Sequence, residues 1–288
     1  MSLEGRLVLA ALEGVASGLV LALTALGLSL VFGVMRIVNV AHGEFYMLGA
    51  VITWYASFIA GSFFPAAVAA PIAVGALALI IDRFVLRPIR YAPEATIVAT
   101  IGVLYVIQQL VLSIYGPYAR PVAPPLTFRI GFPWFGYSGY KLVVAGTAAL
   151  LLAATWLIVR RTTFGLYMRA TQQDREIAVA FGVPVQRVYA ATFSLGAVLA
   201  AIAGTLVVPL EQAHYLMGLD ALLLSFMVVI IGGLGSLRGT LVAALLIGLT
   251  DGIVSVFFSP TLARIIASLV VALVLVVRPR GLYGDAPA

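Results

Sequence analysis

Apolar residues occur along this chain in long runs, and short polar stretches separate the runs. A transmembrane helix needs about 20 mostly apolar residues, and roughly 17 at the least. Seven of the runs approach or exceed this length, 44–60 is marginal, and 221–231 is too short by itself. The runs cover residues 7–33, 44–60, 65–86, 96–115, 142–159, 188–209, 221–231, 240–258 and 261–277. The pattern predicts an all-α fold, a polytopic membrane helical bundle of eight or nine transmembrane helices with broken or re-entrant segments.

The composition supports the same fold class. The 288 residues are 63% hydrophobic and 10% charged, which is more apolar than a soluble domain needs. There is no cysteine, so disulfides, zinc–thiolate sites, Fe–S clusters and thiol catalysis are excluded. The first apolar run, of about 26 residues, exceeds the roughly 7–15 of a signal-peptide core, so we expect it to be the first span. We expect residues 1–288 to form a single transmembrane domain, with any energy-consuming domain on another polypeptide.

The basic residues indicate an orientation. Only one of the seventeen is a lysine, and the arginines lie where spans end, so the net charge of +6 does not indicate nucleic-acid binding. If the polar segment 160–187 is cytoplasmic and the spans alternate, twelve basic residues fall on the inner side and five on the outer side. This bias agrees with the positive-inside rule. It predicts an external N-terminus and a cytoplasmic C-terminus, with Arg278 and Arg280 inside.

The external loop 116–141 is rich in proline and aromatic residues. Proline fixes φ and removes a hydrogen-bond donor, so we expect no long helix here. The aromatic residues suit the headgroup region: Trp134, Phe135, Tyr137 and Tyr140. The loop either lies on the bilayer surface or offers a landing surface to an external protein, and we favour the first interpretation.

The longest polar interruption runs from Arg160 to Arg187. Within it Ala170, Asp174 and Ala178 are four residues apart, a spacing that places them on one face of a short helix. Gly182 is suited to end that helix, because glycine adopts the left-handed conformation easily, and proline at 184 suits the next helix start. The segment is either a helix held against the membrane face or an ordinary solvated loop.

Small residues recur at spacings typical of close helix packing in lipid. They are Gly14 and Gly18 in the first run, and Gly196, Ala200 and Gly204 in the sixth. In lipid the hydrophobic effect does not drive helices together, so close backbone approach matters more. These residues indicate a bundle and say nothing of its function.

Two stretches break the helical pattern at polar or glycine-rich positions. One contains Asn39, His42 and Glu44, and a Glu at the start of an apolar run should face the bundle interior, water or a partner. The other contains Gly232, Gly233, Gly235 and Ser236. Broken helices of this kind often line transport pathways, whereas the second stretch suits a tight turn equally well.

No set of residues for catalysis or metal binding can be assembled from the sequence. The chain has two histidines, and the H-x-E at His42 and Glu44 differs from the H-E-x-x-H of zinc enzymes. We therefore expect no enzymatic activity, no metal and no cofactor. Glu13 and Asp251 lie inside apolar runs, and each stands alone there, which argues mildly against a proton-driven carrier.

Three motifs carry a family resemblance. VNVAHGEFYMLGA (38–50), RATQQDREIAVAFGV (169–183) and GGLGSLRGTLVAALLIG (232–248) together resemble the inner-membrane permease of branched-chain amino-acid ABC importers, in particular the H-type subunit of the leucine/isoleucine/valine system. The motifs occur in the family's order, so the resemblance covers nearly the whole chain.

The resemblance implies a cytoplasmic coupling helix that docks on an ATPase, with its pattern carried by Arg169, Ala170, Asp174, Ala178 and Gly182. It also implies a second, homologous permease, two cytoplasmic ATPase subunits that use the ATP, an external substrate-binding protein and a location in the cytoplasmic membrane of a prokaryote. The substrate path would include Asn39, His42, Glu44 and the 232–236 backbone. Alternatives are a permease for urea, amides or another small solute, and a stand-alone secondary carrier or channel.

Overall fold

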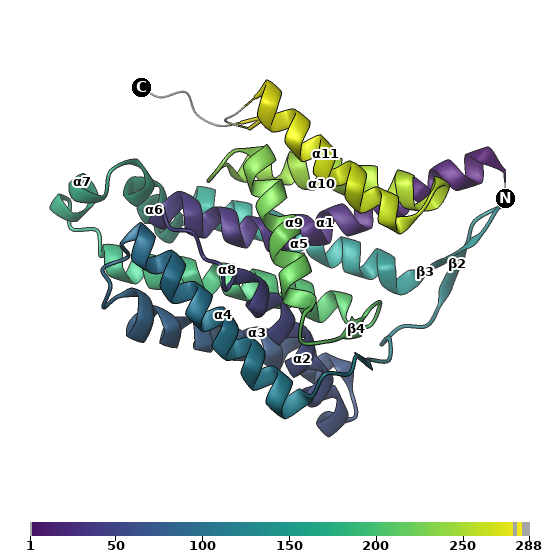
Figure 1. Cartoon of the computed structure of the whole chain (residues 1–288), viewed down its shortest axis with the longest axis horizontal. Coiled ribbons are helices and arrows are strands. Elements are labelled where there is room, and N and C mark those ends of the chain that lie inside the picture. Colours follow the sequence, from purple (N-terminus) through teal and green to yellow (C-terminus); the bar gives the residue numbers. More distant parts are fainter. Residues whose placement is uncertain (1, 279–280, 284–288) are drawn as a thin grey trace.

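The computed structural model describes residues 2–278 and 281–283, and within them the chain is a bundle of helices (Figure 1). Nine longer helices match the nine apolar runs of the sequence. They are α1 (Leu3–Met35), α2 (His42–Ala60), α3 (Phe63–Ile81), α4 (Pro93–Tyr115), α5 (Gly139–Arg161), α8 (Val185–Val207), α9 (Met217–Gly232), α10 (Leu237–Phe257) and α11 (Pro260–Val277). The predicted polytopic helical membrane bundle is confirmed.

Six of the described helices are long and apolar enough to span a membrane: α1, α3 with the π-helical turn η1 (Asp82–Leu86) that continues it, α4, α5, α8 and α10. Helix α9 is apolar but has 16 residues. The predicted count of eight or nine crossings therefore depends on how many of the helices α2, α9 and α11 also cross the membrane.

The bundle has two distinct ends. The short helices α6 (Thr163–Gln173) and α7 (Arg175–Ala180) lie at one end, which we name the α6–α7 end (Figure 1). The start of α1 and strands β2 (Arg129–Gly131) and β3 (Gly136–Ser138) lie at the other, the hairpin end. Residues 281–283 bond to the last turn of α9, since the backbone N–H groups of Leu282 and Tyr283 donate to the carbonyls of Ile231 and Gly232.

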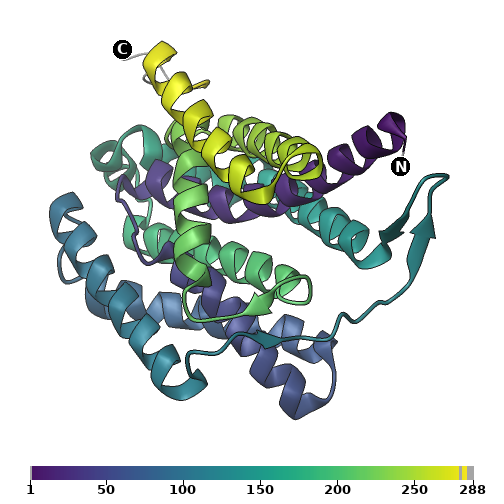
Figure 2. The ribbon, with the colours of Figure 1, turned by 45° about the vertical axis from the view of Figure 1, so that its right-hand side comes forward.

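Helix α1 lies at the centre of the bundle, while α11 and α4 lie at opposite outer faces (Figure 2). Glycines bring the α1 backbone into contact with two neighbours, as their spacing predicted. A Cβ on Gly14 would lie 2.8 Å from the carbonyl oxygen of Gly248 in α10, and a Cβ on Gly27 would lie 2.5 Å from that of Gly196 in α8. Gly204 likewise packs against the backbone of Tyr46 in α2.

The loop 116–141 contains no helix before Gly139, as its prolines predicted, but it does contain a short hairpin. Strands β2 and β3 pair antiparallel, and β1 (Arg120–Pro121) pairs with β4 (Gln212–Ala213). The four aromatic residues expected in the headgroup region differ in exposure, and Trp134 is 41% exposed whereas two tyrosines are buried. Tyr137 and Tyr140 are buried, and the Tyr140 hydroxyl donates a hydrogen bond to the carbonyl of Leu206 at 2.9 Å.

The glycine contacts of α1 give a stability test. We expect Gly248→Ala to destabilise the protein by about 1–3 kcal/mol, because the added methyl group would overlap the Cα of Gly18. Gly102→Ala in α4 is the matched control, since a Cβ there meets nothing within 4 Å and alanine favours helix by up to about 1 kcal/mol. Melting temperatures of both variants in detergent measure the difference. Equal melting temperatures would contradict a packing role for Gly248.

Candidate functional site

The polar segment 160–187 folds into two short helices, so the prediction of one helix through Ala170, Asp174 and Ala178 is wrong. Helix α6 ends at Gln173 and α7 begins at Arg175. Asp174 between them has extended backbone angles, and its side chain accepts a hydrogen bond from the N–H of Ile177 at 2.9 Å. Aspartate is among the best helix N-cap residues, and here capping prevails over continuation of the helix.

The end of α7 is formed as predicted. Gly182 has a φ of +81°, in the left-handed region that favours glycine. The N–H groups of Gly182 and Val183 donate back to the carbonyls of Val179 and Ala178 at 2.9 and 3.0 Å. Pro184 lies one position before α8, as its N-cap residue.

Helix α7 has one buried residue and an exposed apolar surface. Ala178 is 3% exposed and packs into the protein's own core, so it does not face outward. Ile177 and Val179 are each 56% exposed, and Phe181 is 84% exposed. We name Ile177, Val179 and Phe181 the α7 apolar face. Exposed apolar groups at the polar end of a bundle are typical of a contact with another protein.

Helix α6 is attached to the ends of two transmembrane helices. The guanidinium of Arg169 donates to the carbonyl of Val159 in α5. The guanidinium of Arg36, just past the end of α1, donates to the carbonyl of Gln172 at 3.2 Å. Ala170 lies beside these contacts and packs against the core. Movement of α6 would therefore act directly on α1 and α5.

Helix α7 is connected to α3 through a series of aromatic and ionic contacts. The Arg175 guanidinium lies 5.8 Å from the ring centre of Tyr189 in α8. The Tyr189 and Tyr91 rings meet edge to face at 4.8 Å. The Tyr91 hydroxyl then donates to the Asp82 carboxylate at 3.1 Å, and Arg87 lies 3.7 Å from the same carboxylate.

Burial keeps this connection in one protonation state. Desolvation by burial, with a smaller contribution from the Asp82 carboxylate, raises the pKa of Tyr91 to about 12. The phenol therefore remains a hydrogen-bond donor throughout the physiological range. Tyr91 also has a φ of +57°, which is unusual for a residue with a side chain, so its position is imposed by its surroundings.

The first group of predicted path residues lies at the start of α2, inside the bundle. Asn39 is buried, and its side-chain oxygen accepts a hydrogen bond from the N–H of Ala41 at 3.1 Å. His42 is buried with its Nε2 2.9 Å from the Thr24 carbonyl of α1, so this nitrogen carries the proton. Glu44 is fully buried, and among the described residues neither of its carboxylate oxygens has a hydrogen-bond partner.

The second group forms a tight turn between α9 and α10, at the α6–α7 end. Gly233 and Gly235 have φ values of +99° and +79°, and Gly235 packs against Gly33 of α1. Gly232 packs against Gly239 in α10, and the Ser236 hydroxyl caps α10 by accepting from the Gly239 N–H at 3.1 Å. The two groups lie apart, because His42 adjoins Gly27 while Gly235 adjoins Gly33, roughly 9 Å further along α1.

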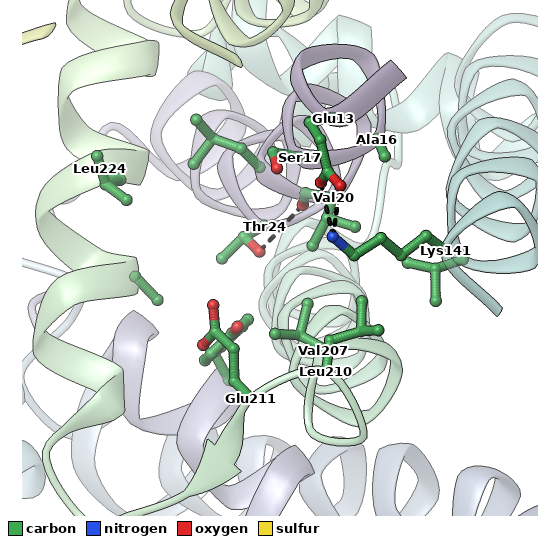
Figure 3. A pocket seen from close by; sticks show the side chains of 14 residues that line it. Glu13, Ala16, Ser17, Val20, Thr24, Lys141, Val207, Leu210, Glu211 and Leu224 are labelled. Atoms are coloured by element: carbon green, nitrogen blue, oxygen red, sulfur yellow. Dashed lines mark hydrogen bonds and ion pairs between the residues drawn. The ribbon is translucent and has the colours of Figure 1, made fainter. Parts of the chain in front are cut away.

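A cavity of about 380 Å³ lies between α1, α2, α5, α8 and α9 (Figure 3). None of the predicted path residues lines it. Instead, the Lys141 ammonium at the start of α5 is bonded to both carboxylate oxygens of Glu13 in α1, at 2.6 and 2.7 Å. The view of Glu13 as an isolated acid is therefore wrong, and Asp251 too interacts with another residue.

The sequence holds no signal for this cavity, because Glu13 and Lys141 are 128 residues apart and pair only in the folded chain. A metal site is a different matter: no group of three or more His, Cys, Asp or Glu residues within the described residues is placed to hold a metal ion. The chemistry that the cavity offers is thus the recognition of charge by an ammonium and carboxylates next to apolar side chains.

Comparison with known proteins shows similarity along nearly the whole chain. The family model described as "Branched-chain amino acid transport system / permease component" matches residues 10–277. The high-affinity branched-chain amino acid transport system permease protein LivH of Escherichia coli (strain K12) is 29% identical over 298 residues, and the match covers 94% of each chain. BraD of Pseudomonas aeruginosa, a permease protein of the same description, is 27% identical with 94% of each chain covered. A fructose import permease of Rhizobium meliloti, FrcC, is 32% identical over 42% of this chain.

The left-handed end of α7 gives a second test. We expect Gly182→Val to cost about 1–2 kcal/mol, because a β-branched residue strains the backbone at this φ. Gly182→Asn is the matched control, since asparagine tolerates this conformation and a side chain at position 182 meets nothing within 4 Å. Hydrogen–deuterium exchange of the amides of residues 175–183 should be faster in Gly182→Val than in Gly182→Asn. The same rate in both would show that α7 does not depend on this conformation.

Proposed function

Because the chain belongs to the family of branched-chain amino acid transport permeases, we propose that it is the membrane-spanning subunit of an ATP-driven importer of branched-chain or other apolar amino acids. The observation that carries this proposal is the similarity to LivH and BraD, which extends over 94% of each chain. A shared fold alone supports many functions, whereas similarity over nearly the whole length of both chains supports a shared function.

We assign four kinds of partner to this subunit: a second homologous permease, two cytoplasmic ATPase subunits, an external substrate-binding protein and the membrane lipid. The permease itself supplies the pathway and the ATPases hydrolyse the ATP. Within the described residues, the parts outside the long helices are short: α6, α7 and the strands of the loops. This arrangement supports a division of labour in which separate subunits supply energy and capture substrate.

In the proposed cycle the α7 apolar face docks on an ATPase subunit. ATP-driven closure of the two ATPases would shift α6 and α7 as a rigid body. Arg169 and Arg36 would transmit the shift to α5 and α1. Arg175 would transmit it through Tyr189 to α8 and through Tyr91 to α3. The pathway would then alternate between access from inside and access from outside.

This role refines the sequence-based hypothesis for the coupling residues. Arg169, Asp174 and Gly182 would act by positioning α6 and α7, as an attachment, a cap and a helix end respectively. Ala170 and Ala178 would act as packing residues beneath the docking surface. The groups that touch the ATPase would be Ile177, Val179 and Phe181, which no spacing rule in the sequence distinguished.

Uptake by the reconstituted complex tests both the transport and the docking. Proteoliposomes with the permease pair, the ATPases and the loaded binding protein should accumulate labelled leucine only with ATP, and valine and isoleucine should compete whereas urea should not. Ile177→Ser with Phe181→Ser should abolish most uptake and release the ATPases on purification. Both side chains are exposed, so the stability of the permease should change by no more than about 0.5 kcal/mol per site.

Phe258→Ser is the matched control, because Phe258 is 72% exposed just past α10, at the opposite end from α7. It should leave uptake and ATPase retention unchanged. Normal uptake by the Ile177/Phe181 variant would exclude docking through the α7 apolar face. Uptake without ATPase subunits would instead favour a stand-alone carrier, and competition by urea would favour the alternative substrate class.

We further propose that the α6–α7 end is cytoplasmic and the N-terminus external, in the cytoplasmic membrane of a prokaryote. Eleven of the twelve basic residues assigned to the inner side belong to the described part of the chain, and the twelfth, Arg280, lies outside it. Arg36, Arg169 and Arg175 all lie at the α6–α7 end. Lys141 lies at the other end, where α5 begins.

Two tags test this orientation. A tag added after Ala288 should be protected in intact cells, because the positive-inside rule places the C-terminus in the cytoplasm. A tag inserted in the loop between Pro121 and Phe132 should be accessible to an external protease. Accessibility of both tags from the same side would contradict the orientation.

A further inference from the structure

The cavity beside the Glu13–Lys141 pair extends from the hairpin end into the bundle. Its wall on α1 runs from Glu13 to Thr24, which lie eleven positions and thus roughly 16 Å apart along the helix. Ser17 lies between them on the same wall and is exposed. A volume of about 380 Å³ lies within the range of roughly 300–1,000 Å³ that is typical of small-molecule sites.

Charges of both signs border this cavity. The Lys141 ammonium and the Glu13 carboxylate meet on one side, and Figure 3 shows the Glu211 carboxylate across the cavity, pointing toward Thr24. Glu211 belongs to the segment that follows α8. Two carboxylates and one ammonium around one space can bind a ligand that itself carries one positive and one negative group.

The remaining wall is mostly apolar. Four helices and the segment after α8 contribute aliphatic side chains to it: Val20, Leu21, Val144, Val207, Leu210 and Leu224. An aliphatic group in contact with them would gain roughly 0.8 kcal/mol for each buried methylene. The cavity therefore combines recognition of charge at one place with recognition of an aliphatic chain at another.

We propose that this cavity binds a zwitterionic α-amino acid with an aliphatic side chain. Lys141 holds the carboxylate of the ligand, Glu13 and Glu211 receive its ammonium, and the aliphatic wall contacts its side chain. That this ligand is the transported substrate rests on the proposed function. The assignment places a substrate site in the outer part of the bundle, away from the 232–236 turn.

The existing ion pair does not obstruct such a ligand. A bound amino acid places its carboxylate against Lys141 and its ammonium against Glu13. Lys141 thus exchanges one carboxylate partner for another, and Glu13 exchanges one ammonium partner for another. The two side chains are 31% and 29% exposed, and with the ligand bound each charge still faces one of the opposite sign. A ligand with a single charge, or none, would break the pair without replacing both halves.

A single introduced cysteine tests occupancy of the cavity. The chain has no cysteine of its own, so Ser17→Cys creates one unique thiol in a position that differs from serine by a single atom. In the assembled, reconstituted complex, a small cationic methanethiosulfonate should modify this thiol and abolish uptake, and excess leucine should slow the modification roughly tenfold or more.

Two controls accompany this experiment. Ala123→Cys in the external loop should be modified at the same rate with and without leucine, and its uptake should persist. The wild-type permease reports any effect of the reagent on cysteines of the other subunits. Modification of Ser17→Cys that neither blocks uptake nor slows with leucine would overturn the proposal.

A charge-neutral double variant separates ligand binding from simple stabilisation by the ion pair. Glu13→Gln with Lys141→Met removes both charges at once, so no unpaired charge remains. We expect the KM for leucine to rise roughly tenfold or more, because hydrogen bonds to charged groups contribute strongly, while assembly and melting temperature stay near those of the wild type. An unchanged KM would mean that the pair only holds α1 and α5 together, and would overturn the proposal.

The outcomes distinguish a failure of the cavity site from a failure of the proposed function. Leucine uptake by the wild type with no effect of either variant leaves the proposed function standing and removes the cavity site. Failure of the wild type to transport any amino acid refutes the proposed function and the site with it. Uptake with protection at Ser17→Cys and a raised KM in the double variant supports both.

Discussion

The backbone contacts of α1 with α8 and α10 are the interaction on which the rest of this structure depends. In lipid the hydrophobic effect does not hold helices together, so close van der Waals packing must do so. Gly14, Gly18 and Gly27 allow this packing in the middle of α1. Because α1 is fixed at the centre, it presents Glu13 and Ser17 to the cavity, offers the Thr24 carbonyl to α2, and ends beside α6.

This central position means that the candidate substrate site and the candidate coupling segment share one rigid element. Helix α5 has the same arrangement. It carries the cavity residue Lys141 near its start, and near its end it accepts the hydrogen bond from Arg169 of α6. A helix of this length transmits displacement over its whole extent because its backbone hydrogen bonds are satisfied internally. The two sites therefore need no separate relay between them.

The sequence predicted those features that depend on neighbouring residues. The apolar runs gave the nine longer helices, the small residues gave the contacts of α1 and α8, and Gly182 gave the end of α7. Asp174 shows where local rules compete, because its spacing suits a helix face and its chemistry suits a cap. The cavity could not be predicted, because Glu13 and Lys141 pair only when distant segments meet. The exposed side of α7 could not be predicted either, because it depends on which side of the helix packs against the rest of the chain.

Below the cavity, the first turn of α2 separates its inner end from the rest of the bundle. Thr24 and Tyr46 line the inner end, and His42 is bonded to the Thr24 carbonyl from behind. His42 is fully buried, so breaking this hydrogen bond without a replacement would cost about 1–3 kcal/mol, which the proposed cycle would have to supply. Six residues earlier, Arg36 binds α6. In the proposed cycle, a shift of α6 would therefore act on the short non-helical segment between α1 and α2, directly before His42. This would link movement of the ATPases to access from the cavity.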